Sequence, residues 1–159
     1  MTTPSLIFEM QLPRFRSWEL IPGSLILKET AAAAGIKFSA TSGCTAYQYD
    51  KSFLIPGRGC LPPSEVLAPK TWEVETRAIE LQQVKGVEGN FYAIKPFAVS
   101  FMGVRRSDLG IHQDANAPGS AGCIVIRDRE HWKLFQEKMK ALSLRGLQRL
   151  PLTVKYTIA

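Results

Sequence analysis

The sequence predicts a mainly β single domain, with one helix near the C-terminus followed by a final strand. Residues 151–158 alternate apolar and polar side chains, which is the period of a half-buried strand. Most other apolar segments are short and bounded by proline or glycine, whereas a helical period occurs only over 129–142. The chain has 159 residues, of which 45% are hydrophobic, so it can bury one core. No linker divides it, and we expect residues 1–159 to form one domain.

The remaining strands are predicted from short apolar segments between chain breakers. They comprise 6–10, 15–20, 24–28, 36–40, 71–74, 91–94 and 98–102. Residues 76–84 mix strong helix formers with Ile79 and Val84, so strand and loop both stay open there. Residues 41–69 contain too many glycines and prolines for regular structure. We expect a long loop, and its aromatic residues favour a functional one.

The single helix is predicted from apolar residues that recur every three or four positions. These residues are Trp132, Phe135, Met139 and Leu142. Asp128 is placed to cap the start, and Gly146 lies beyond the end. We expect an amphipathic helix over 129–142.

The formal charge of +6 and the pI near 9.4 favour association with polyanions. The basic residues are scattered, with no Arg/Lys run or zinc-finger spacing, so we expect no nucleic-acid partner and consider an acidic cell envelope instead. The apolar runs are far shorter than the roughly 20 residues that span a bilayer, so we expect a soluble protein without membrane insertion. The N-terminus lacks the features of a secretory signal. If the substrate lies outside the membrane, we expect synthesis in the cytoplasm and delivery to the cell wall or periplasm by another system.

A histidine and a cysteine flank a turn of small residues. Ten residues separate His112 from Cys123, and 119–122 read Gly-Ser-Ala-Gly. Thiol catalysis needs a thiolate, and a nearby imidazole can remove the proton and return it to a leaving amine. Gly122 would let the backbone approach a substrate closely, and N–H groups of 120–123 would stabilise an oxyanion. The alternative is that Cys123 is a small buried hydrophobe and His112 a core histidine.

Other residues of these types have less specific interpretations. His131, on the expected helix, is predicted to be a solvated surface residue. A metal site of His112, Asp114 and Cys123 would lack a clear fourth ligand, so no metal or cofactor is expected. Cys44 and Cys60 flank the long loop, and we favour no disulfide between them. The sequence gives no indication of oligomeric state.

The stretch from Ile111 to Ile124 resembles a family signature. Ile111-His112, followed by Pro118-Gly119-Ser120-Ala121-Gly122-Cys123-Ile124, is similar to the His…Ser/Thr-x-Gly-Cys-Ile/Val signature of the L,D-transpeptidase catalytic domain. Upstream, 23–27, 37–43 and 57–63 resemble the early strands, the Ser-Gly loop and the Gly-x-Gly-Pro-Ile-Pro-x-Gly turn of that family. The resemblance covers roughly residues 23–127, in the right order.

The resemblance implies a β-sandwich or barrel that acts on peptidoglycan stem peptides without a cofactor. Cys123 would attack the amide after the third residue of a tetrapeptide stem, and His112 would be the base. Ser120 and Gly122 would shape the turn. Asp114 either holds the imidazole or caps its own turn, and both interpretations stay open.

Three departures from the family pattern bear on substrate binding. Ala121 stands where many members have histidine, Val125 stands where an arginine commonly follows Gly-Cys-Ile, and the spacing from histidine to cysteine is short. Side chains that would anchor the substrate instead are Arg127, Arg105, Arg106 and, in the long loop, Tyr47.

The short spacing resembles compact phage-lysis (endolysin-like) and secreted-effector relatives, which often hydrolyse rather than cross-link. We therefore expect stem-peptide cleavage or exchange through an acyl-enzyme, with hydrolysis favoured. The alternative is a non-catalytic wall-binding or phage-particle module that retains the fold.

Overall fold

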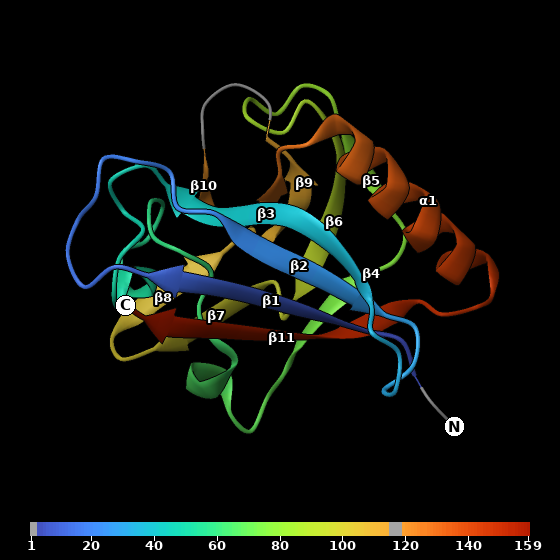
Figure 1. Ribbon diagram of the computed structural model, residues 1–159, viewed down its shortest axis with the longest axis horizontal. Helices are drawn as coiled ribbons and strands as arrows, with labels where there is room; N and C mark the ends of the chain where they lie inside the picture. Colours follow the sequence, from blue (N-terminus) through green and yellow to red (C-terminus); the bar gives the residue numbers. More distant parts are fainter. Residues whose placement is uncertain (1–2, 115–118) are drawn as a thin grey trace.

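The computed structural model describes residues 3–114 and 119–159. Its strands and its helix are labelled in Figure 1. They are β1 (Ser5–Leu12), β2 (Gly23–Lys28), β3 (Ile36–Cys44), β4 (Trp72–Glu75), β5 (Ile79–Leu81), β6 (Gly89–Lys95), β7 (Ala98–Phe101), β8 (Val104–Ser107), β9 (Gly110–Gln113), β10 (Gly119–Ile126), α1 (Arg129–Leu144) and β11 (Arg149–Ile158). Two short 3-10 helices, Ser52–Leu54 and Ser64–Leu67, lie between β3 and β4.

The main sheet closes on itself. Its strand order is β4-β11-β1-β2-β3-β10-β9-β6-β5, and β4 also pairs with β6. The β4–β6 pairing closes a barrel of eight strands, while β5 pairs with the first half of β6 outside the ring. Strands β7 and β8 form a separate hairpin. The expectation of a mainly β fold with one C-terminal helix and a final strand is confirmed in that form.

The barrel interior is filled by alternate side chains of its strands. In β1, Leu6, Phe8, Met10 and Leu12 are buried, while the residues between them are half-buried or exposed. Burial of a large apolar side chain contributes about 1.5–3 kcal/mol, so these layers supply most of the driving force for closure. No helix within residues 3–114 and 119–159 is long and apolar enough to cross a bilayer.

The helix covers the barrel on the side of β3, β9 and β10. Its start is capped by Asp128, whose carboxylate accepts the N–H groups of Glu130 and His131. The apolar stripe packs edge to face on aromatic rings of the sheet, with Phe135 against Phe38 and Tyr92. The predicted helix is thus confirmed, and it continues two residues further to Leu144.

Two predicted segment states are wrong. Residues 15–20 are a loop rather than a strand, because Phe15 and Trp18 have no core to face and are 80% and 75% exposed. The expected loop over 41–69 begins too early, since β3 continues to Cys44. There it pairs with β10. Gly43 lies within this strand although its φ is +86°, and glycines and prolines nearby had led us to predict a loop.

Candidate active site

The two chemically active residues lie on adjacent parallel strands. The register of β9 and β10 places His112 opposite Val125 and Ile111 opposite Ile124. Because side chains alternate across a strand, Ile111 and Ile124 point into the core, whereas His112 and Cys123 share the outer face. Cys123 lies where the pairing of β10 with β3 shifts register, and such bulges often re-aim a side chain at a functional site.

His112 and Cys123 line the same cavity, which has a volume of about 600 Å³. Its large apolar lining residues come from β5, from the segment between β5 and β6, from β6 and from the residues after β6. They include Leu81, Val84, Val87, Phe91 and Phe97. The ring of Phe91 stacks on the imidazole with 6.0 Å between centroids. Lys85 and Asp108 are the charged side chains among these lining residues.

The imidazole of His112 is oriented by a backbone carbonyl. Nδ1 lies 2.8 Å from the carbonyl oxygen of Gln113, so a proton on Nδ1 is donated there and Nε2 keeps its lone pair. Burial lowers the pKa of His112, although the Gln113 bond and the charge of Asp114 oppose that shift. The ring is therefore neutral at pH 7 and can accept a proton.

The thiol of Cys123 is nearly enclosed, with 9% of the residue exposed. Its Sγ lies 3.7 Å from the carbonyl oxygen of Asp108, to which it donates. Burial raises the pKa of Cys123 to about 11, against the backbone bond from Gly110 and the positive charge of Arg106. The resting cavity holds a neutral thiol and a neutral imidazole, so proton transfer must accompany nucleophilic attack.

The small-residue turn before Cys123 is held by Ser120. Its hydroxyl oxygen accepts the N–H groups of Gly122 and Gly43 at 3.2 and 3.3 Å and donates to the carbonyl of Cys123. Ser120 was expected to shape this turn, and its contacts are of that kind. The N–H of Gly122 already has a partner, so an oxyanion would have to compete for it.

Arg106 is buried behind the same turn. It is 2% exposed, and its guanidinium donates to four carbonyl oxygens, those of Phe53, Gly59, Cys60 and Ala121, at 2.6–3.4 Å. It joins the segment before Cys60 to the turn at Ala121, and it does not line the cavity. Arg106 was expected to anchor the substrate. Its bonds to the backbone could not be predicted from sequence, because the carbonyls that it binds meet only in the folded chain.

The contacts of Gly122 explain why this position is glycine. Its φ is +127°, and an added Cβ would collide with Nη2 of Arg106. This glycine was expected to let a substrate approach the backbone closely. In the folded chain the group that approaches it is the buried guanidinium.

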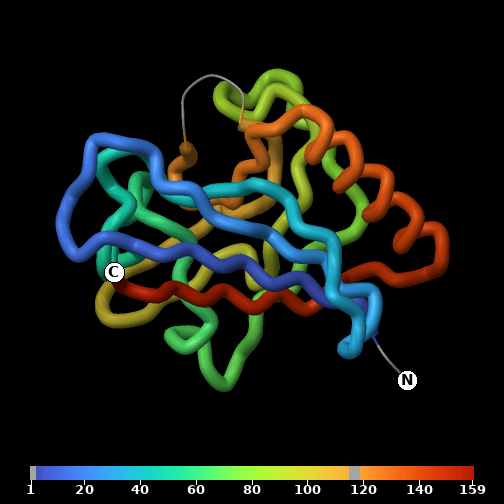
Figure 2. Tube along the Cα trace, viewed as in Figure 1, coloured from blue at the N-terminus to red at the C-terminus, as the bar shows by residue number. Residues whose placement is uncertain are grey.

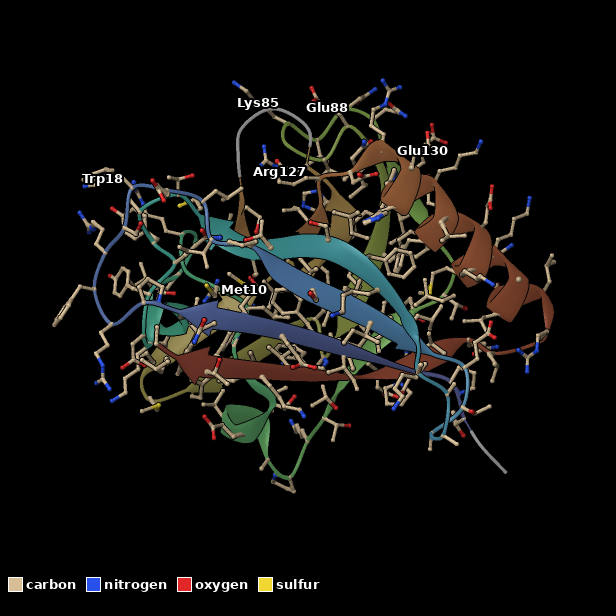
Figure 3. All side chains as sticks on the ribbon, viewed as in Figure 1. Met10, Trp18, Lys85, Glu88, Arg127 and Glu130 are labelled. Atoms are coloured by element: carbon tan, nitrogen blue, oxygen red, sulfur yellow. The ribbon has the colours of Figure 1, made fainter. Side chains whose placement is uncertain are left out.

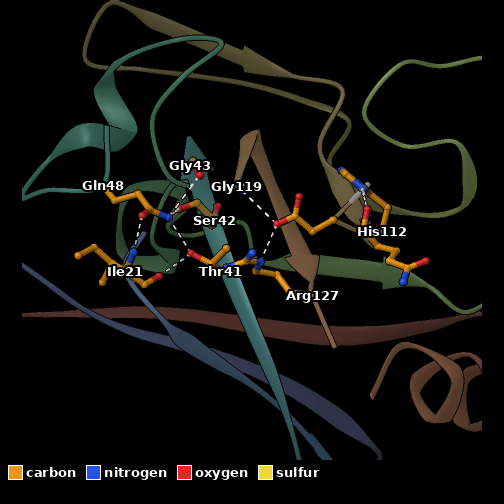
Figure 4. Close-up of polar contacts among 10 residues, drawn as sticks. Ile21, Thr41, Ser42, Gly43, Gln48, His112, Gly119 and Arg127 are labelled. Carbon is orange, nitrogen blue, oxygen red and sulfur yellow. Dashed lines mark hydrogen bonds and ion pairs between the residues drawn. The ribbon is translucent and has the colours of Figure 1, made fainter. Parts of the chain in front are cut away.

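Asp114 and Arg127 form an ion pair at the far end of β9 and β10 (Figure 4). Asp114 Oδ2 lies 3.2 Å from Nε of Arg127 and accepts the N–H of Gly119 at 3.2 Å. Asp114 thus contacts Gly119 and Arg127, whereas the partner of Nδ1 of His112 is the carbonyl of Gln113. Burial raises the pKa of Asp114.

The two other proposed anchors lie away from the cavity lining. Arg105 is exposed on β8, with Nη1 3.4 Å from the hydroxyl of Ser107. Tyr47 lies beside the guanidinium groups of Arg16 and Arg58, 5.0 and 5.1 Å from its ring centroid. Neither Arg105 nor Tyr47 is among the residues that line the cavity of Cys123.

A buried glutamine that the sequence analysis did not identify fastens the loop before β2. Gln48 is 1% exposed; its Oε1 accepts the N–H of Ile21, and its Nε2 donates to Thr41 and Ser42 (Figure 4). Thr41 in turn donates to the carbonyl of Ile21. This network aligns the end of β3 from which Ser42 reaches the carbonyl of Gly122.

His131 is half-buried on the helix, so it is partly solvated, and it also makes contacts with the sheet. Its Nδ1 accepts the N–H of Ser39 at 2.9 Å, and its ring packs edge to face on Phe38. The residue therefore fixes the first turn of α1 to β3. Cys44 and Cys60 are free thiols, and burial raises the pKa of Cys60 to about 11.

A second cavity, of about 520 Å³, lies between α1, β6 and the segment before β5. Its lining includes Arg77, Tyr92, Lys133 and Lys140 but no cysteine or histidine. Among the described residues, no three His, Cys, Asp or Glu side chains are grouped as a metal site would require. Comparison with known proteins finds no family model, curated protein or solved structure that matches this chain.

Proposed function

We propose that this chain is a cysteine acyl-transfer enzyme of the L,D-transpeptidase type, which cleaves peptidoglycan stem peptides. The observation that supports it most is the placement of His112 and Cys123 on one face of adjacent strands, lining one cavity. The second support is the Gln113 carbonyl, which leaves Nε2 of His112 as the basic nitrogen. Neither feature is needed if both residues only fill the core.

The reaction would begin from the neutral pair. Nε2 of His112 takes the proton from Sγ of Cys123 as the sulfur attacks the carbonyl carbon of the stem amide. The resulting imidazolium gives that proton to the leaving amine when the C–N bond breaks, and a thioester remains on Cys123. A water molecule then attacks the thioester, with His112 again accepting its proton, and the collapse of the adduct returns the thiol. Hydrolysis is favoured because the short His–Cys spacing resembles compact relatives.

Among the residues that the structure describes, one lysine on the cavity wall is available to bind a charged group of the substrate. Of the arginines considered from sequence, Arg106 is bound to carbonyls and Arg127 is paired with Asp114. Lys85 is exposed, lines the cavity and forms no ion pair within residues 3–114 and 119–159. We assign to Lys85 the anchoring of a substrate carboxylate, while the apolar wall takes methyl and methylene groups of the stem.

The alternative function is a wall-binding or phage-particle module without turnover. Ala121 and Val125 favour it, because both replace polar residues of the family pattern with apolar ones. On either account the chain acts on the cell wall.

Purified protein incubated with muropeptides, with products identified by mass spectrometry, tests the proposal. We expect shortened stems from the wild type, no products from Cys123→Ala, and wild-type products from the matched control Cys44→Ala, whose thiol lies outside the cavity lining. Cleavage by Cys123→Ala at the wild-type rate would contradict the mechanism. Muropeptide binding without products from the wild type would favour the non-catalytic module.

A further inference from the structure

Large apolar side chains project into solvent from one end of the barrel. Phe15 and Trp18, in the loop between β1 and β2, are 80% and 75% exposed, and Met102, in the turn between β7 and β8, is 73% exposed. Figure 2 shows this loop and this turn at the end of the barrel where residue 159 lies, and Figure 3 shows Trp18 pointing away from the molecule. Phe15, Trp18 and Met102 are called the barrel-end patch below.

Contacts between the loops hold them together at this end of the barrel. The N–H of Asp50 donates to the carbonyl of Pro13 at 2.9 Å, which joins the loop of Phe15 to the segment after β3. Phe53, in that segment, lies 6.0 Å from the ring of Phe101, the neighbour of Met102. Apolar side chains gathered at one end in this way usually mark an interaction site.

The patch is surrounded by positive charge. Arg14, Arg16, Lys51 and Arg58 are exposed in the same segments, against the carboxylates of Glu19 and Asp50. None of the four cations forms an ion pair in the described part of the chain. The end therefore carries a basic excess and complements an anionic surface.

The arrangement of the rings disfavours recognition by stacking. The guanidinium of Arg16 lies 5.8 Å from the ring of Trp18 and 5.0 Å from that of Tyr47, and Arg58 lies 5.1 Å from Tyr47. A nucleobase that stacked on these rings would compete with arginines already placed against them. A bilayer interface suits the same arrangement, because aromatic rings settle at headgroup level while arginines bind lipid phosphates.

We propose that the barrel end docks on an anionic lipid surface. Phe15, Trp18 and Met102 enter the headgroup layer, and Arg14, Arg16, Lys51 and Arg58 contact the phosphates. The loops lie on the membrane without crossing it, so the docking is peripheral. It is independent of the chemistry at Cys123, and it would hold the cavity close to a membrane.

The native tryptophans supply the assay. Trp72 and Trp132 are 0% and 7% exposed, so a change of environment on docking is reported by Trp18. The full-length protein is mixed with vesicles of phosphatidylcholine alone or with 30% phosphatidylglycerol. We expect cosedimentation and a blue shift of emission only with the anionic vesicles, weakening as salt rises.

Two variants separate docking by the patch from general adhesion. Phe15→Ser/Trp18→Ser should lose binding to anionic vesicles by tenfold or more, whereas Leu144→Ser, a residue also 80% exposed but at the end of α1, should bind as the wild type does. Unchanged thermal melting would show that both variants fold. Equal binding by the double variant, binding without the blue shift, or binding to peptidoglycan sacculi but not to vesicles would overturn the proposal.

Discussion

Replacement of Gly122 by alanine should destabilise the protein through Arg106. The new methyl group would collide with Nη2 of Arg106, which donates to the carbonyls of Gly59 and Ala121. The guanidinium cannot shift without losing those bonds, because Nη1 is held by the carbonyls of Phe53 and Cys60. Since φ of Gly122 is +127°, the alanine would also be strained at the backbone.

The magnitude follows from these two costs. Backbone strain of this kind costs about 1–3 kcal/mol, and each hydrogen bond from a charged donor contributes about 1.5–3 kcal/mol. Gly122→Ala should thus lower the free energy of unfolding by about 4 kcal/mol or more, a large part of the about 5–15 kcal/mol of a whole domain. Arg106→Met should cost about 3–5 kcal/mol, because it leaves buried carbonyls without donors.

A double-mutant cycle by urea unfolding isolates the contact. In the Arg106→Met background the guanidinium is absent, so Gly122→Ala should cost only its backbone strain. The coupling energy should then be about 2 kcal/mol or more, with the double variant more stable than additivity requires. Additive losses in the two variants would refute the collision between Gly122 and Arg106 as the reason for glycine.

Three further outcomes follow from the site and its supports. Alkylation of Cys123 by iodoacetamide should speed up about tenfold per pH unit from pH 7 to 9, because its pKa is raised to about 11 and the thiolate fraction grows throughout that window; a plateau below pH 8 would indicate a preformed thiolate. Gln48→Ala should lower the free energy of unfolding by about 2–3 kcal/mol, since it removes bonds to Ile21, Thr41 and Ser42, and calorimetry showing no loss would contradict that role. His131→Ala should cost about 1 kcal/mol of stability through the Ser39 bond while muropeptide cleavage stays within about twofold, whereas His112→Ala should slow cleavage by about 10² or more; the reverse ranking of rates would contradict the assignment of the base.

The local sequence pattern predicts the elements that have one clear amphipathic face. The final strand alternates strictly, and the helix has an apolar stripe with Asp128 at its cap, so both were predictable from sequence neighbours alone. The prediction of a strand over 15–20 was wrong because Phe15 and Trp18 are residue types that favour strands, although their side chains face solvent here. Strands β8 and β9 were not predicted because Val104–Ser107 holds two arginines and Gly110–Gln113 is too short to show a period.

That His112 and Cys123 could line one cavity was predictable, whereas the environment that sets their ionisation was not. Ten intervening residues are few enough for His112 and Cys123 to line one cavity. The parallel register of β9 and β10 and the cavity wall before β6, however, depend on tertiary pairing. Arg106 shows the same limit. A charged residue in a short strand gives no local sign that four carbonyls from two distant segments will enclose it.

The most direct test of the proposed mechanism is to locate the acyl group during turnover. The protein would be mixed with a tetrapeptide muropeptide, quenched in acid within milliseconds to seconds, digested and mapped by mass spectrometry. The proposed mechanism requires an adduct of the acyl fragment on the peptide that contains Cys123. This adduct should accumulate before free product and be absent from Cys123→Ala. An adduct on Cys44 or Cys60, or cleavage that proceeds with no adduct and survives Cys123→Ala, would contradict it.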